Sequence, residues 1–145
     1  MCGIAAILGA ADMALAQRMV ATISHRGPDG LGTWGDEVCS LAHSRLSIVD
    51  VVGSNQPMGS EHGCWLVQNG EIYNYRNLRE KYSSYQWRTK GDGESILAVH
   101  KAYSPPPMNQ IDAVRSSQIG WVRRTANADQ MGNPAQRHIE WVSQL

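Results

Sequence analysis

Apolar residues in the first half of the chain are spaced as in short strands and one amphipathic helix. Residues 2–8 (CGIAAIL) form an apolar run that is typical of a buried strand. Residues 12–23 place apolar side chains at helical intervals after Asp12, which is a favourable capping residue, so a helix is expected there. The runs 32–34 and 39–44 are separated by a short polar turn and predict a hairpin.

Further along, the pattern predicts one more strand and two more helices. Residues 64–68 are strand-like, and residues 75–82 and 92–103 repeat apolar side chains at helical intervals. A strand or strand end is also expected at residues 46–49, and a brief strand at residues 85–88. Strands and helices joined by short connections indicate a layered α+β domain.

The pattern changes after Tyr103. Residues 104–107 (SPPP) end the preceding helix, because proline lacks the backbone donor and clashes with the turn before it. Residues 108–145 are polar, with weak periodicity and no stretch that predicts a strand. We therefore expect one domain over residues 2–103 and a divergent tail of unknown structure over residues 104–145.

Composition and charge exclude several classes of function. A chain of 145 residues with 42% hydrophobic residues fits one domain with a core, and its zero formal net charge suggests neither a nucleic-acid nor a membrane-surface partner. The N-terminus has no basic segment, and its apolar run is too short to cross a bilayer. We expect a cytoplasmic protein without a signal peptide or a membrane helix.

The three cysteines are an odd number without close pairs, which argues against a disulfide framework. No spacing of Cys or His is that of a zinc site, so no metal is expected. Cys39 and Cys64 lie in apolar runs that suit inert core thiols. Removal of Met1 would give Cys2 both a thiol and a free α-amino group, and that amine can accept a proton at neutral pH. By itself, position 2 is better explained as a small, tolerated residue.

Six short motifs reverse that judgement. In chain order they are Met1-Cys2-Gly3-Ile4, His25-Arg26-Gly27-Pro28-Asp29-Gly30, Arg45-Leu46-Ser47-Ile48-Val49-Asp50, Gln56-Pro57-Met58, Asn69-Gly70-Glu71-Ile72-Tyr73-Asn74-Tyr75 and Thr89-Lys90-Gly91-Asp92. Together they resemble the glutamine amidotransferase domain of asparagine synthetases over residues 2–103. The form HRGPDG is more similar to this branch than to the purine or glucosamine branches. The resemblance implies the four-layer αββα sandwich of N-terminal-nucleophile hydrolases, incomplete in this chain.

The resemblance also implies a reaction. Cys2 is expected to attack the side-chain amide of L-glutamine, release ammonia and form a γ-glutamyl thioester that water hydrolyses to glutamate. The Asn69 side-chain amide and the Gly70 backbone N–H match the family's oxyanion hole, and an amide donor and a glycine donor in one turn can converge on a developing oxyanion. Without the neighbouring motifs, Asn-Gly would be interpreted as a hairpin turn.

Four further residues match positions that bind the substrate. Arg45 matches the clamp for the α-carboxylate, which a guanidinium can hold with two hydrogen bonds; the alternative is a surface arginine at a strand end. Asp92 matches the residue that holds the α-ammonium; it can also act as a helix N-cap. Glu71 is expected to add negative charge near the same ammonium, and Arg26 to shape the pocket rim near the thiol. Without the family match, this charged loop with two glycines would be interpreted as a plain turn.

Several features depart from the family. Gly91 stands where Ser or Thr is usual and is expected to loosen the loop that presents Asp92, and Gln68 stands where an aromatic residue is usual. His43 and His100 are expected to be structural. The resemblance stops near Tyr103, as a truncation or frameshift would produce.

No phosphate-binding loop occurs in the sequence. The resemblance implies that ATP and Mg²⁺ act only in a synthetase domain, which is expected to be absent from this chain, and that such a domain or subunit would accept the ammonia. The alternative function is a catalytically inactive fragment that binds glutamine or has a regulatory role.

Overall fold

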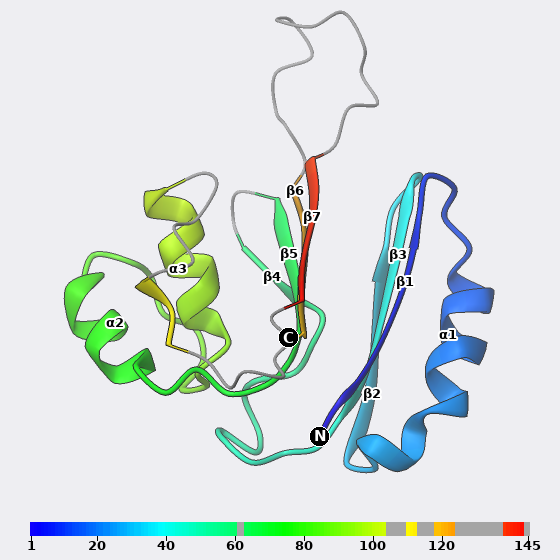
Figure 1. Cartoon of the computed structure of the whole chain (residues 1–145), viewed down its shortest axis with the longest axis horizontal. Helices are drawn as coiled ribbons and strands as arrows, with labels where there is room; N and C mark the ends of the chain where they lie inside the picture. The colour runs from blue at the N-terminus through cyan, green and yellow to red at the C-terminus, as the bar shows by residue number, and fades with distance from the viewer. Residues whose placement is uncertain (61–62, 104–109, 113–117, 124–137, 144–145) are drawn as a thin grey trace, which may run out of the picture.

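The computed structural model describes residues 1–60, 63–103, 110–112, 118–123 and 138–143 (Figure 1). For residues 118–123 and 138–143 the structure describes the course of the backbone. The strands are β1 (Gly3–Leu8), β2 (Gly30–Gly35), β3 (Cys39–Arg45), β4 (Met58–Gly59), β5 (Cys64–Asn69), β6 (Gln118–Arg123) and β7 (His138–Ser143). The helices are α1 (Met13–Thr22), α2 (Tyr75–Lys81) and α3 (Glu94–Ala102), with a 3₁₀ turn at Ser24–Arg26.

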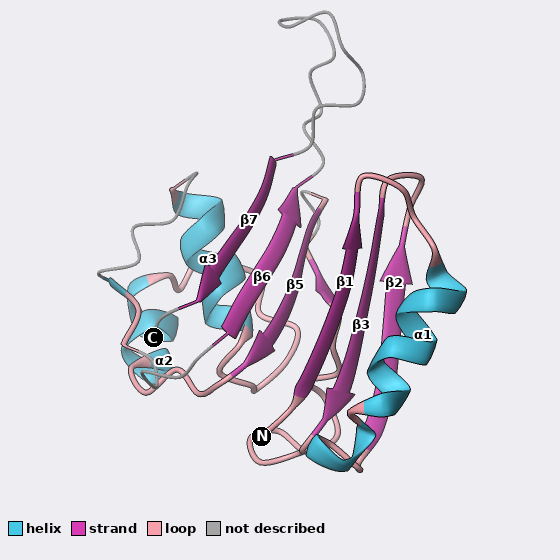
Figure 2. Ribbon diagram, turned by 45° about the vertical axis from the view of Figure 1, so that its right-hand side comes forward, coloured by secondary structure: helices cyan, strands magenta, loops and turns pink. Residues whose placement is uncertain are grey.

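The strands form two antiparallel sheets, so the protein has a mixed α+β fold, as predicted. The first sheet has the order β1-β3-β2 and the second the order β4-β5-β6-β7 (Figure 2). The predicted β2–β3 hairpin is confirmed, with Thr33 opposite Ala42. Ala42 also faces Ala5 of β1, which makes β3 the central strand of its sheet.

Three apolar cores hold the elements together. Helix α1 packs on the outer face of the first sheet through Ala16 and Val20, while α2 and α3 cover the outer face of the second sheet (Figure 1). The third core lies between the sheets, where Leu41 of β3 meets Val67 of β5. All seven residues of β3 are buried, because both faces of the strand are covered.

The polar residues that precede α1 and α2 make different contacts. Asp12 caps α1 as predicted, accepting a hydrogen bond from Leu15 N at 2.8 Å. Asn74 precedes α2, but its side chain bonds the backbone of Gln110 and Asp112 instead of capping the helix.

Among the described residues, no helix has the length and apolar content that a bilayer crossing requires.

Two of the expected strands are wrong. Residues 46–49 form a loop rather than a strand, and the carbonyl of Val49 accepts a hydrogen bond from Arg45. Residues 85–88 also form no strand, since the backbone N–H of Arg88 is bonded to the carboxylate of Glu94. In both segments side chains take up backbone groups that a sheet would otherwise pair.

The expectation that no strand follows Tyr103 is also wrong. Strand β6 pairs with β5, placing Trp121 opposite Leu66, and β7 pairs with β6. Ile111, between these strands and α3 in sequence, is buried in the core beneath the second sheet. The division of the chain at Tyr103 stays a prediction, and the rest of the expected tail lies outside the described residues.

Candidate active site

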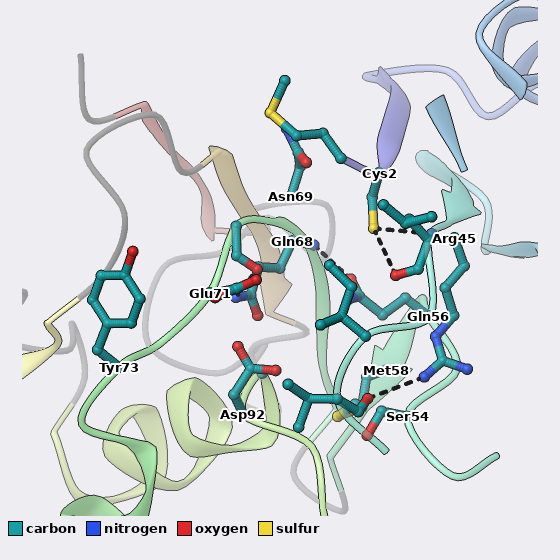
Figure 3. Close-up of a pocket in the computed structure, with 16 residues that line it drawn as sticks. Cys2, Arg45, Ser54, Gln56, Met58, Gln68, Asn69, Glu71, Tyr73 and Asp92 are labelled. Atoms are coloured by element: carbon teal, nitrogen blue, oxygen red, sulfur yellow. Dashed lines mark hydrogen bonds between the residues drawn. The ribbon is translucent and has the colours of Figure 1, made fainter. Parts of the chain in front are cut away.

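A cavity of about 290 Å³ lies where strand ends from both sheets meet the start of α3 (Figure 3). Cys2 precedes β1, Arg45 ends β3 and Asn69 ends β5, so residues far apart in sequence converge on one site. Six of the seven predicted site residues line the cavity, namely Cys2, Arg45, Asn69, Gly70, Glu71 and Asp92. Arg26 is the exception.

The thiol of Cys2 is fixed by the backbone at the end of β3. The Leu46 N–H donates to Cys2 Sγ at 3.4 Å, and Sγ lies 3.8 Å from Leu46 O. Met1 lines the same cavity and is 65% exposed. Loss of Met1 would therefore leave the new α-amino group of Cys2 beside the thiol at the cavity mouth.

Arg26 contacts the backbone of Cys2 and does not line the cavity. Its Nε donates to Cys2 O at 3.0 Å, across 24 positions of sequence. Arg26 thus anchors the residue that carries the thiol, whereas the sequence had suggested a place at the pocket rim.

Asn69 presents its side chain to the cavity. The residue is 5% exposed, and its side-chain amide forms no hydrogen bond with the described residues. Gly70 follows it, and the chain then enters α2 rather than returning along a paired strand. The hairpin interpretation of Asn-Gly is therefore wrong.

Arg45 is 8% exposed, which excludes the alternative of a surface arginine. Its Nη1 donates to Val51 O at 2.8 Å and to Asn55 Oδ1 at 3.1 Å. Its Nη2 donates to Asp50 O at 2.6 Å and to Val49 O at 3.4 Å. The loop after β3 therefore wraps around the guanidinium and holds it in one orientation.

Asp92 does not cap α3. Gly93 occupies the N-cap position without a side-chain hydrogen bond, whereas Asp92 Oδ2 accepts from Ile72 N at 2.8 Å. This contact joins the turn after β5 to the start of α3. Asp92 and Glu71 come from opposite sides of that junction and both line the cavity.

The charges around the cavity are separated by sign. Figure 3 shows Arg45 on one side and Glu71 with Asp92 on the other, while Cys2 and Asn69 lie at one end. A ligand with one positive and one negative group would meet opposite charges on the two walls. An α-amino acid whose side chain reaches toward Cys2 has this form.

Several residues at the cavity were missed in the sequence. Gln56, which precedes a cis proline, accepts from Gln68 N at 2.6 Å, and both residues line the cavity. Ser54 and Tyr73 line it as well. Gln56 lies within one of the quoted motifs, but nothing local to its sequence indicates that its side chain reaches β5.

His43 lies between the sheets directly behind this site. The residue is fully buried, and its Nε2 lies 3.1 Å from Gln68 O. Burial lowers the pKa of His43 to about 4; the Gln68 carbonyl opposes this shift, and the charge of Arg45 adds to it. A neutral imidazole linking β3 to β5 fits the structural role predicted for it.

No group of three His, Cys, Asp or Glu side chains within the described ranges is arranged to hold a metal ion. Cys39 is fully buried, and burial raises the pKa of its thiol to about 11. Cys64 is buried as well. Of the cysteines, Cys2 lines the cavity.

Comparison with known proteins agrees with this geometry. A family profile described as a glutamine amidotransferase domain matches residues 1–114, which extends past Tyr103, where the resemblance was expected to stop. The glutamine-hydrolyzing asparagine synthetase 2 of Arabidopsis thaliana is 39% identical over 120 residues, covering 79% of this chain and 21% of the relative. The glutamine-hydrolyzing asparagine synthetase of Zea mays is 36% identical over 122 residues, covering 80% of this chain and 21% of the relative.

The chain thus spans about a fifth of the length of the curated relatives it matches. The family profile nevertheless covers most of the chain itself, including every residue that lines the cavity. The chain therefore belongs to the glutamine amidotransferase domain family.

Proposed function

We propose that this chain hydrolyses L-glutamine to glutamate and ammonia, with Cys2 as the nucleophile after removal of Met1. The observation that carries the proposal is the arrangement of the cavity walls. The Cys2 thiol and the Asn69 amide lie at one end, and oppositely charged groups lie on the two walls beyond them. Glutamine has an amide at one end and an ammonium and a carboxylate at the other, which is complementary to this layout.

The first half of the reaction forms the thioester. The α-amino group of Cys2 takes the thiol proton, directly or through a water, and the sulfur attacks the δ-carbon of glutamine. The carbonyl oxygen becomes an oxyanion that accepts hydrogen bonds from the Asn69 amide and the Gly70 N–H. Collapse of this intermediate breaks the C–N bond, and the leaving nitrogen takes the proton and departs as ammonia.

The second half regenerates the thiol. Water attacks the γ-glutamyl thioester while the α-amino group accepts its proton, and a second oxyanion forms in the same place. Breakdown of that intermediate releases glutamate and returns the proton to sulfur. Arg45 would hold the α-carboxylate, and Asp92 with Glu71 would hold the α-ammonium through both halves.

The finer description of the fold supports the same assignment. Two facing antiparallel sheets carry α1 on one outer side and α2 with α3 on the other. This order of layers is that of the αββα sandwich of N-terminal-nucleophile hydrolases, to which we assign the domain. In that assignment the reacting residue stands at the start of the first strand, and Cys2 directly precedes β1.

We assign the released ammonia to ATP-dependent asparagine synthesis by a synthetase domain or subunit, because the relatives bear that name. ATP and Mg²⁺ would act there. The described residues of this chain offer no set of ligands for a metal ion, and the sequence has no phosphate-binding loop. Cytoplasmic localisation is part of this proposal.

One observation favours a second candidate. Met1 lines the cavity, and while it remains attached the amine of Cys2 is part of a peptide bond and cannot accept a proton. A chain that keeps Met1 would bind glutamine without turning it over, as a regulatory or binding module does.

Glutamate release from glutamine by the full chain tests the proposal. The wild-type protein should produce glutamate and ammonia in equal amounts, and Cys2→Ala should produce neither. Cys64→Ala removes a thiol from the core under α2 and α3 and should keep the wild-type activity. Intact mass identifies the first residue of the same sample. Turnover that survives in Cys2→Ala would contradict the proposal, and binding without turnover by a chain starting at Met1 would establish the second candidate.

A further inference from the structure

Asp50 touches both of the loops that carry the charged walls of the cavity. One loop, residues 46–55, follows β3 and surrounds the Arg45 guanidinium. The other, residues 88–93, precedes α3 and carries Asp92. Asp50 O accepts from Arg45 Nη2 at 2.6 Å, while Asp50 Oδ2 accepts from Lys90 N at 2.8 Å. One residue therefore connects the two loops across 40 positions of sequence.

The backbone of Asp50 is held in an uncommon conformation. Its φ of 50° lies in the left-handed region, where a residue other than glycine is disfavoured by roughly 1 kcal/mol or more. Two contacts within the loop secure it: Asp50 Oδ1 accepts from Gly53 N at 3.1 Å, and Oδ2 accepts from Ser54 Oγ at 3.0 Å. Such conformations persist where the surroundings enforce them and occur often at functional sites.

The two loops also approach each other closely at Gly91 and Ser54. A Cβ on Gly91 would overlap Ser54 Oγ, so glycine is the residue that fits. Arg79 holds the second loop from its other side, with Nη2 donating to Thr89 O at 2.6 Å and to Gly91 O at 3.1 Å. The expectation that Gly91 loosens this loop is therefore wrong, because its neighbours fill the space and bond its backbone.

We propose that Asp50 is a positioning residue that sets the spacing between the carboxylate-binding wall at Arg45 and the ammonium-binding wall at Asp92. The proposal rests on the function proposed above. The ammonium and carboxylate of an α-amino acid are attached to the same carbon, so the two walls must stay at one separation to hold both groups. The Lys90 N–H keeps the pKa of the Asp50 carboxyl below its usual value, as do Ser54, Gly53 and Arg45, which favours the charged acceptor at neutral pH.

Comparing ligands that bind one charged wall with a ligand that binds both distinguishes a positioning role of Asp50 from a general distortion of the cavity. Glutamine engages both walls. Glutaramate lacks the ammonium and 4-aminobutanamide lacks the carboxylate, so each engages one wall. A change in the spacing therefore weakens glutamine more than either analogue, whereas a distorted cavity weakens all three alike.

The experiment measures the Kd of each ligand by isothermal titration calorimetry on the full chain carrying Cys2→Ala, a variant expected to bind glutamine without hydrolysing it. Weak ligands are measured by their displacement of glutamine. We expect Asp50→Asn to raise the Kd for glutamine about tenfold and the Kd for each analogue by less than about twofold. Asp36→Asn is the matched control, since Asp36 accepts from two backbone N–H groups, Val38 N and Cys39 N, in the β2–β3 turn away from the cavity. It should leave all three values unchanged.

Equal effects of Asp50→Asn on all three ligands, or no difference from Asp36→Asn, would overturn the proposal. If Asp50→Asn fails to fold, Gly91→Ala should weaken glutamine more than either analogue by forcing the loops apart. Equal weakening of all three ligands by Gly91→Ala overturns the proposal as well. If the wild-type protein binds glutamine without turnover, the proposed hydrolysis is refuted and the role of Asp50 is not. If it does not bind glutamine at all, the proposed hydrolysis and the positioning role of Asp50 are both refuted.

Discussion

At the scale of single residues, Asn69 is a donor without an acceptor. Its side chain lines the cavity, and its amide forms no hydrogen bond to the described residues. The Arg45 guanidinium, by contrast, forms four hydrogen bonds to the loop after β3. An uncommitted donor beside the Cys2 thiol suits an oxygen that gains charge during the reaction.

Asn69→Ala should lower kcat for glutamine hydrolysis by about 10²–10³, with KM changed by less than a few-fold, because the lost bond forms in the transition state. Steady-state kinetics provides both values. Asn77→Ala, on an exposed position of α2, is the control and should match wild type. A folded Asn69→Ala protein with wild-type kcat would remove Asn69 from the oxyanion hole.

His43 makes stability depend on pH. Its pKa in the folded protein is about 4, against 6.5 for an unperturbed histidine. Above pH 6.5 the side chain is neutral in both states and the fold keeps its full stability. Between pH 6.5 and 4 the unfolded chain binds a proton that the folded chain excludes, so stability falls across that window.

The free energy of unfolding should therefore drop by about 3 kcal/mol between pH 7 and pH 4 because of His43 alone. Urea unfolding at a series of pH values measures it. His43→Gln should flatten that part of the profile, while His25→Gln, at an exposed position, should leave it as in wild type. Profiles of equal slope for wild type and His43→Gln would contradict this account.

At the scale of elements, the loop before α3 is organised around one buried carboxylate. Glu94 is fully buried at the start of α3 and accepts from Arg88 N at 2.9 Å, Thr89 N at 2.7 Å and Thr89 Oγ1 at 2.8 Å. Arg79 Nη2 lies 4.0 Å from it. The first turn of a helix also favours a negative charge, so α3 and its loop stabilise the same group.

Glu94→Ala should cost about 3–5 kcal/mol of unfolding free energy, because it leaves buried donors and a nearby cation without their partner. Glu80→Ala, on the exposed side of α2, should stay within about 0.5 kcal/mol of wild type. Urea denaturation of both variants measures the difference. Comparable stabilities would mean that the loop is organised by other contacts.

Periodicity was sufficient for the elements that bury one face. β1, α1, the β2–β3 hairpin, β5, α2 and α3 were predicted to within a few residues. It failed at residues 46–49 and 85–88, where the side chains of Arg45 and Glu94 form hydrogen bonds with backbone groups of these segments. It also failed for β6 and β7, whose patterns are weak. β6 becomes a strand by pairing with β5, about 50 residues earlier, and β7 does so by pairing with β6.

The sequence was sufficient to predict six of the residues that line the cavity, but not the contacts that hold those residues in place. Residues whose type suits the reaction stood in recognisable motifs, and six of the seven line one cavity. The anchoring of Cys2 O by Arg26 and the bridge from Asp50 to Lys90 depend on long-range backbone contacts. No local signal in the sequence reports such contacts.

At the scale of the whole molecule, the segment beyond Tyr103 contributes β6 and β7 to the second sheet. β6 covers the edge of β5 and β7 extends the ladder, while Ile111 fills part of the core under α2 and α3. Without them β5 would present unpaired backbone groups along its edge, which favours aggregation. We expect the domain to need residues that the sequence pattern had assigned to a separate tail.

A chain ending at Tyr103 should lose cooperative unfolding and aggregate, whereas the full chain should unfold in one transition. Circular dichroism during heating and size-exclusion chromatography measure both properties. Ile111→Ala in the full chain separates the two contributions, since the lost side chain alone should cost about 2–5 kcal/mol. A shortened chain with the same unfolding midpoint as the full chain would show that β6 and β7 are dispensable.

The most direct test of the central claim is the site of reaction with a glutamine analogue that carries a diazoketone in place of the amide. Peptide mass analysis of the treated protein should show an N-terminus that begins at Cys2 and one added group on that residue. Cys39 and Cys64, both buried, are internal controls and should stay unlabelled. Retained Met1, or label on any residue other than Cys2, would contradict the claim that Cys2 is the nucleophile.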